Sequence, residues 1–214
     1  MRVTSHRAGE AGDFAFTTET MEQAKQVMAR YPDGRQASAT IALLDLAQRQ
    51  NGGWLPGEAI EYVANLLEIA PIRVHEVASF YAMFNLKPVG THFIQVCRTT
   101  PCWLCGSDGI AQACLDTLGL GLGETTEDGL FTVVEVECLG ACANAPMVQI
   151  NDDYFEDLTP ERMAEMIGDL KAGKPVPSGS QTGRPGSCPA GGPTSLLDSS
   201  ESNVGQALDS EGSD

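Results

Sequence analysis

Hydrophobic residues recur every three or four positions in the first part of the chain, as they do on one face of an α-helix. The clearest set with this spacing is Ile60, Val63, Leu67 and Ala70. Breaks at Pro32, at residues 52–53 and at Pro71 divide the region into four short helices. Because short connections favour antiparallel neighbours, we expect a small helical bundle over residues 17–83, after a leader of residues 1–16.

The hydrophobic period changes from residue 84 onward. Two short apolar runs, 93–96 and 131–136, have the character of buried strands, and a helix is predicted between them from Pro101 to Leu118. The runs at 147–150 and 154–156 flank an Asn-Asp-Asp turn, which indicates a β-hairpin.

A last helix is predicted after Thr159 and Pro160, because a capping residue followed by proline is a typical helix start. The resulting order, βαβ and then ββα over residues 84–175, is that of a thioredoxin-like domain. The right-handed crossover rule makes its first two strands parallel neighbours. The fold class is therefore α+β or α/β, a helical bundle followed by this domain.

The tail, residues 176–214, is rich in Gly, Pro and Ser, and from Thr194 onward it has acidic residues without Lys or Arg. Such a segment buries too little apolar surface to offset the entropy of ordering it. We expect a flexible acidic tail that is disordered alone or ordered only against a partner.

The formal net charge is −16 and the isoelectric point is about 4.4. This balance argues against binding nucleic acid or anionic lipid, both of which need a basic face. The longest apolar stretches are far shorter than a membrane span, so we expect no direct membrane insertion. Residues 1–14 lack the apolar core of a secretory signal.

Four of the seven cysteines follow the first two predicted strands in pairs, Cys97 with Cys102 and Cys138 with Cys142. If these strands are neighbours, both loops open at the same edge of the sheet and the four thiolates converge. A [2Fe–2S] cluster needs this arrangement, since each iron takes two thiolates. Gly140 would let backbone N–H groups approach the cluster, and a helix starting at Pro101 would turn its positive end toward it.

Three other interpretations of the cysteines remain open at this point. Cys97, Cys102, Cys105 and Cys138 match plant-type ferredoxin spacing, although that fold is mostly antiparallel β and leaves Cys142 unexplained. A structural zinc site is the second, with looser spacing than usual, in a module whose metal only holds the fold. The third is a thioredoxin-type dithiol of Cys102 and Cys105, which gives the other cysteines no role.

The chain closely resembles the thioredoxin-like [2Fe–2S] subunit of respiratory complex I, the NADH:quinone oxidoreductase (NuoE type). Residues 97–107, 137–147 and 154–160 carry the resemblance, supported by 54–56 and 79–81. It spans about residues 14–197, and both cysteine loops agree with the family in spacing and filler residues.

The resemblance implies that Cys97, Cys102, Cys138 and Cys142 ligate the cluster. It implies partners too: a flavoprotein subunit that holds FMN and the NADH site, and the large iron–sulfur subunit. The location implied is the peripheral arm of the complex, on the cytoplasmic face of a bacterial inner membrane, or in the matrix of mitochondria. Related subunits serve NAD-dependent formate dehydrogenases and hydrogenases, which are the alternative.

The chain has no dinucleotide-binding glycine loop and no defensible pair of nucleophile and base. We therefore expect no catalytic residues and no complete enzyme in this chain alone. It would act as one redox subunit of an oxidoreductase.

Overall fold

The computed structural model describes residues 14–192 and residue 195, and these fall into two compact units. One unit comprises the residues up to Ile94 together with Leu120–Val134. The other comprises Gln95–Gly119 together with the residues from Glu135 onward. The domain boundary predicted after residue 83 stays a prediction.

The four predicted helices of the first unit are present. Their bounds, with one short 3₁₀ turn, are α1 Thr18–Met28, η1 Gln36–Ala39, α2 Thr40–Gln50, α3 Gly57–Leu66 and α4 Pro71–Phe80. Pro56 is the N-cap residue of α3, and Pro71 is the first residue of α4. Proline is favoured at a helix start because the N–H that it lacks would have no partner there.

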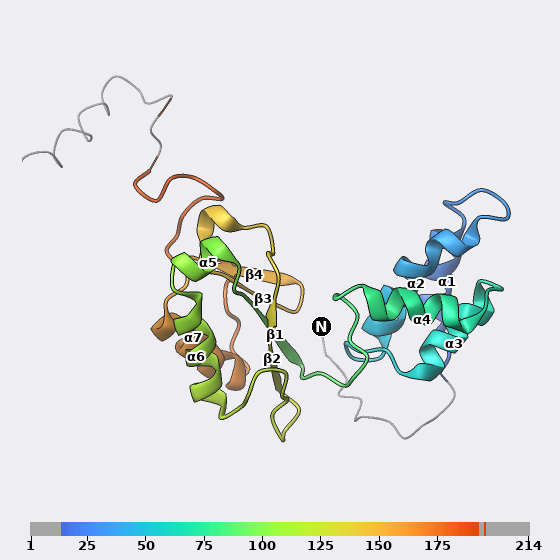
Figure 1. Cartoon of the computed structure of the whole chain (residues 1–214), viewed down its shortest axis with the longest axis horizontal. Helices are drawn as coiled ribbons and strands as arrows, with labels where there is room; N and C mark the ends of the chain where they lie inside the picture. Colours follow the sequence, from blue (N-terminus) through green and yellow to red (C-terminus); the bar gives the residue numbers. More distant parts are fainter. Residues whose placement is uncertain (1–13, 193–194, 196–214) are drawn as a thin grey trace, which may run out of the picture. The chain divides into compact units, whose positions relative to one another are not determined.

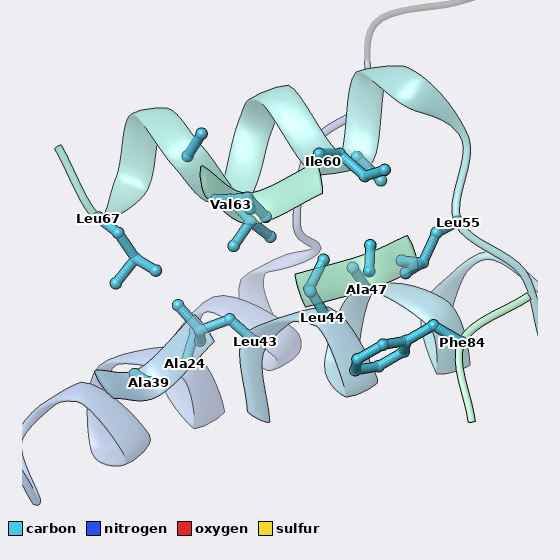
Figure 2. Packing of buried hydrophobic residues seen from close by; sticks show 14 of the residues in the cluster. Ala24, Ala39, Leu43, Leu44, Ala47, Leu55, Ile60, Val63, Leu67 and Phe84 are labelled. Atoms are coloured by element: carbon cyan, nitrogen blue, oxygen red, sulfur yellow. The ribbon is translucent and has the colours of Figure 1, made fainter. Parts of the chain in front are cut away.

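Small and branched apolar side chains from α1, α2 and α3 fill one continuous core (Figure 2). Leu43, Leu44 and Val63 are fully buried in it. The spacing of Ile41, Leu44 and Ala47 predicts one inner face for α2, but Ile41 is 38% exposed. The buried residues of α2 are Thr40, Leu43, Leu44 and Ala47, which follow the i, i+3, i+4, i+7 pattern, so Ile41 lies at the edge of the buried stripe.

One five-stranded sheet has the order β2-β1-β3-β4-β5. Its strands are β1 His92–Cys97, β2 Phe131–Val136, β3 Val148–Ile150, β4 Asp153–Glu156 and β5 Gly179–Ser180. The first two strands are neighbours, as predicted, and their parallel direction stays a prediction. The predicted hairpin is present, with β3 and β4 antiparallel.

Three helices belong to the second unit, α5 Thr100–Leu104, α6 Ser107–Leu118 and α7 Pro160–Lys171. The first two were predicted as one continuous helix. Gly106, at φ 92°, adopts a left-handed backbone conformation that ends α5 and caps α6. With only five residues, α5 has a weak dipole, so the expected support from the helix start at Pro101 is small.

Helix α7 begins as predicted, with the Thr159 hydroxyl accepting a hydrogen bond from the Arg162 N–H. Its buried face consists of Met163, Met166 and Ile167. It packs beside α6 (Figure 1).

The tail is more regular than expected over residues 176–192, since β5 pairs in parallel with β4, Phe155 lying opposite Gly179. Our sequence analysis missed this strand. The acidic extension after Leu197 lies outside the described residues. None of the described helices combines the length and apolar character that a membrane crossing requires.

Candidate metal centre

The first cysteine loop, residues 97–102, starts at the last residue of β1. The Cys97 N–H donates to the Met147 carbonyl at 3.4 Å, so the end of the strand is joined to the residue before β3. Cys102 lies within α5. Cys97 and Cys102 are each only 1% exposed, and together with Met147 they form a small buried cluster.

The second cysteine loop, residues 138–142, follows β2 and leads into the short turn η2 Cys142–Asn144. Its two thiols are exposed, and their sulfur atoms lie 3.4 Å apart. Gly140 has φ 88°, which lets the loop fold back so that both cysteines point to one side. The Tyr154 hydroxyl donates to the Leu139 carbonyl at 2.7 Å and anchors the loop to β4.

A polar group of each loop reaches a sulfur atom of the other loop. Thr99 Oγ1 lies 3.4 Å from Cys97 Sγ and also hydrogen-bonds the thiol of Cys138 in the other loop. The backbone N–H of Leu139 reaches back to the Cys97 sulfur. The backbone N–H of Met147 reaches the Cys102 sulfur. The sequence prediction that both loops converge at one sheet edge therefore agrees with the geometry.

Two of the four thiols have a lowered pKa, and the other two have a raised pKa. Burial alone would raise the pKa of Cys97, but hydrogen bonds from Thr99 and from the Leu139 backbone lower it. The backbone N–H of Gly140 lowers the pKa of Cys138.

The other member of each pair has a raised pKa. Burial and the neighbouring Cys97 raise the pKa of Cys102 to about 12. The hydrogen bond with Cys138 raises the pKa of Cys142. Each pair thus contains one thiol with a lowered pKa and one with a raised pKa, as expected for cysteines packed closely together.

The donor set fits a binuclear iron–sulfur cluster. Cys97 is hydrogen-bonded to Cys102, Cys138 is hydrogen-bonded to Cys142, and the Cys97 thiol interacts electrostatically with both members of the second pair. In the described part of the chain, no three His, Cys, Asp or Glu side chains gather closely enough for a single metal ion. A [2Fe–2S] cluster is held by two thiolates on each iron, and hydrogen bonds to the sulfur atoms tune it.

The charged groups beside the first loop are already paired. Arg98 binds Asp108 at 2.5 Å and Glu135 at 2.7 Å, and the hydrogen bond with Asp108 raises the pKa of its guanidinium further. Trp103 Nε1 donates to the same Asp108 carboxylate. Polar support for the thiols therefore comes mainly from N–H groups and the Thr99 hydroxyl.

The remaining three cysteines differ in their exposure to solvent. Cys105 is exposed at the end of α5, and Cys188 is exposed in the tail. Cys114 is fully buried in α6, and burial raises its pKa to about 12.

Three residues at this centre were not singled out from the sequence, namely Thr99, Tyr154 and Arg184, whose Nη1 donates to the carbonyl of Ala143 directly after Cys142. Thr99 could have been noticed because a threonine two positions after a ligand cysteine can turn its hydroxyl back to the sulfur. Arg184 also carries a signal, since it is the only basic residue after Lys174. Nothing local distinguishes Tyr154 from an ordinary strand tyrosine.

Comparison with known proteins gives one consistent family. Residues 24–171 match the family model described as thioredoxin-like [2Fe–2S] ferredoxin. An NADH-quinone oxidoreductase subunit of Rickettsia bellii is 57% identical over 159 residues, covering 74% of this chain and 95% of that protein. A mitochondrial NADH dehydrogenase [ubiquinone] flavoprotein 2 of Dictyostelium discoideum is 50% identical over 92% of this chain and 79% of its own length.

Among solved structures, an NAD⁺-reducing [NiFe]-hydrogenase in its H₂-reduced state superimposes with a TM-score of 0.58. The alignment covers 64% of this chain and 23% of the hydrogenase chain at 21% identity. A likeness at this identity shows a shared fold only. Together with the family match, it confirms the predicted fold class.

Proposed function

Because the chain belongs to the thioredoxin-like [2Fe–2S] ferredoxin family, we propose that it is the [2Fe–2S] electron-transfer subunit of an NADH-quinone oxidoreductase, respiratory complex I. Relatives from bacteria and from a mitochondrion carry this complex in their names at 50% identity or more. The observation that carries the proposal is the approach of the two cysteine loops, in which the Leu139 N–H of the second loop reaches the Cys97 sulfur and the Thr99 hydroxyl of the first loop reaches the Cys138 sulfur.

The proposed ligands are Cys97 and Cys102 on one iron and Cys138 and Cys142 on the other. When bound, the cluster supplies a centre that accepts and releases one electron at a time. The chain's own residues hold the thiolates in place and stabilise their negative charge. Leu139 and Met147 do so through backbone N–H groups, and Thr99 through its hydroxyl.

The two pairs differ in their access to solvent. Cys97 and Cys102 are buried, whereas Cys138 and Cys142 are exposed. Electron exchange with another subunit requires an approach of the cluster to the protein surface. The loop of residues 138–142 is therefore the proposed side of exchange, and the buried pair fixes the cluster to the sheet.

The proposed partners are the flavoprotein subunit that binds FMN and NADH and the large iron–sulfur subunit of the same complex. The proposed location is the peripheral arm of the membrane-associated complex, on the cytoplasmic face of a bacterial inner membrane or in the mitochondrial matrix. The names of the relatives support membership of the complex, and the family resemblance supplies the individual partners.

A role in an NAD-linked formate dehydrogenase or hydrogenase is the alternative subunit function. The hydrogenase likeness is one of fold alone, so it does not favour that alternative. A purely structural metal module is the alternative of a different class. It would bind a redox-inactive ion and show no change on addition of NADH.

The test uses the assembled complex with wild-type chain or with Cys142→Ser, and Cys105→Ser as the matched control. NADH should reduce a [2Fe–2S] centre that low-temperature EPR detects in the wild type and the control and finds altered in Cys142→Ser. Zinc in place of iron, or an EPR spectrum identical in all three complexes, would overturn the proposal.

A further inference from the structure

Residues 176–192, which we call the tail strap, return to the second cysteine loop after α7. Strand β5 of the strap pairs with β4, and the Gln181 N–H donates to the Glu156 carbonyl at 2.9 Å. The strap then reaches the turn η2, whose first residue is Cys142. A segment expected to lack structure is thus joined to a proposed cluster ligand.

Arg184 is the centre of this junction. Its Nη2 forms an ion pair with Asp157, and its Nη1 donates to the Ala143 carbonyl at 2.9 Å. Only 16% of the Arg184 side chain and 6% of the Asp157 side chain are exposed. One guanidinium therefore joins a buried carboxylate to the residue directly after Cys142.

The same turn is held from a second side. Asn144 is 3% exposed, and its Nδ2 donates to the Glu156 carboxylate at 2.6 Å and to the Gly186 carbonyl at 2.8 Å. Asp157 in turn donates its backbone N–H to the Asn144 carbonyl at 2.8 Å. The strap and the residues after β4 therefore enclose the turn in one hydrogen-bonded network.

We propose that Arg184 is a positioning residue that holds the turn after Cys142 and so fixes the Cys138–Cys142 pair for the cluster. This inference rests on the ligand assignment proposed above. A bidentate guanidinium suits the task because its two terminal nitrogens reach two acceptors in fixed directions, whereas a lysine ammonium has no such fork. Without Arg184, the Asp157 carboxylate stays buried with its charge unpaired, and the Ala143 carbonyl loses its donor.

The test compares the full chain with its cluster loaded in four forms, wild type, Arg184→Ala, Arg184→Lys and Arg73→Ala. Arg73 forms an exposed ion pair with Glu76 in α4, so it controls for loss of an arginine. The readouts are the rate of cluster loss to an iron chelator, the EPR line shape after reduction, and the thermal unfolding midpoint.

Arg184→Ala should lose its cluster about tenfold faster than wild type or more, the usual size of effect when a group supporting a metal ligand is removed. Its EPR line shape should change while the cluster is still fully occupied, and Arg184→Lys should restore neither property completely. Arg73→Ala should match wild type in both.

A double variant, Arg184→Met with Asp157→Asn, keeps the proposal testable if Arg184→Ala does not fold. It removes both buried charges but still lacks a donor for Ala143, so its cluster should also be lost faster. Wild-type loss rates and line shapes in the double variant, or in Arg184→Ala, would overturn the proposal. Failure of the wild-type chain to hold iron and sulfide would instead overturn the proposed function.

Discussion

The Tyr154 hydroxyl lies 2.7 Å from the carbonyl oxygen of Leu139, to which it donates a hydrogen bond. This contact joins β4 to the middle of the second cysteine loop. Leu139 also directs its N–H to the sulfur of Cys97, so the residue is held on one side and holds a thiol on the other. The tyrosine therefore supports both cysteine loops.

The substitution Tyr154→Phe should weaken this support while keeping the ring in place. Loss of one hydrogen bond should lower the free energy of unfolding by about 1 kcal/mol. Cluster loss to a chelator should also accelerate, because the Leu139 carbonyl no longer has its donor. Tyr31→Phe, in the first unit, is the control, and equal rates of cluster loss in both variants would contradict the role given to Tyr154.

Because of its backbone conformation, position 140 of the second cysteine loop should accept glycine better than any other residue. Its φ of 88° lies in the left-handed region, although no atom stands within 4 Å of an added Cβ. Gly140→Ala should therefore cost about 1–2 kcal/mol through backbone conformation alone. Urea unfolding would measure the change.

Gly168, in the interior of α7, is the matched control, since its added Cβ also has open space and its φ is not positive. There alanine should stabilise the chain by about 0.5–1 kcal/mol, because glycine is a poor helix former. Shifts of the same sign in the two variants would contradict this account.

Gly90 is required for a different reason, the close approach of a second backbone. A Cβ at this position would meet the Phe131 backbone at 2.6–2.8 Å, and the Gly90 N–H donates to the Thr132 hydroxyl at 2.6 Å. Gly90→Ala should cost about 1–3 kcal/mol, as overpacking usually does. Gly57→Ala, which meets nothing within 4 Å, should leave the thermal midpoint nearly unchanged, and a similar loss in both would refute the argument.

The buried thiol of Cys114 should make stability depend on pH in alkaline solution. Burial raises the pKa of Cys114 to about 12. In the unfolded chain a thiol titrates near pH 8.5, so about 8.5 to 12 is the window in which only the unfolded state releases this proton. Within it the free energy of unfolding should fall by up to about 1.4 kcal/mol per pH unit from this group.

Below this window Cys114 should contribute no dependence on pH, since both states keep the proton. Denaturant unfolding of the loaded chain at several alkaline pH values would measure the slope. Cys114→Ala should have a shallower slope than wild type. Parallel slopes for the two proteins would show that this thiol ionises equally in both states.

Local signals in the sequence were sufficient for most of the elements around the centre. Thr159 and Pro160 marked the start of α7 correctly, because cap hydroxyls and first-turn prolines act within a few residues. The ends of β1 and β2 carried the paired cysteines to one edge of the sheet. The sequence predicted these two strands because short apolar runs mark buried strands, and it predicted their adjacency because consecutive strands usually lie side by side in a sheet.

The features missed from the sequence depend on longer-range contacts or on a single backbone angle. Gly106 divides the predicted helix through its positive φ, while the apolar spacing continues across the break. Strand β5 has only two residues, and its pairing with β4 has no periodic signal of its own. Arg184 acquires its role only because the chain returns to Ala143 and Asp157.

The central claim is that Cys97, Cys102, Cys138 and Cys142 hold one [2Fe–2S] cluster. The most direct test measures iron, acid-labile sulfide and low-temperature EPR on the purified chain, with Cys142→Ser beside Cys105→Ser. Two irons and two sulfides per wild-type chain are expected, with an EPR signal on reduction that Cys142→Ser alters and Cys105→Ser leaves unchanged. Zinc without sulfide, or a signal sensitive to Cys105 and indifferent to Cys142, would contradict the claim.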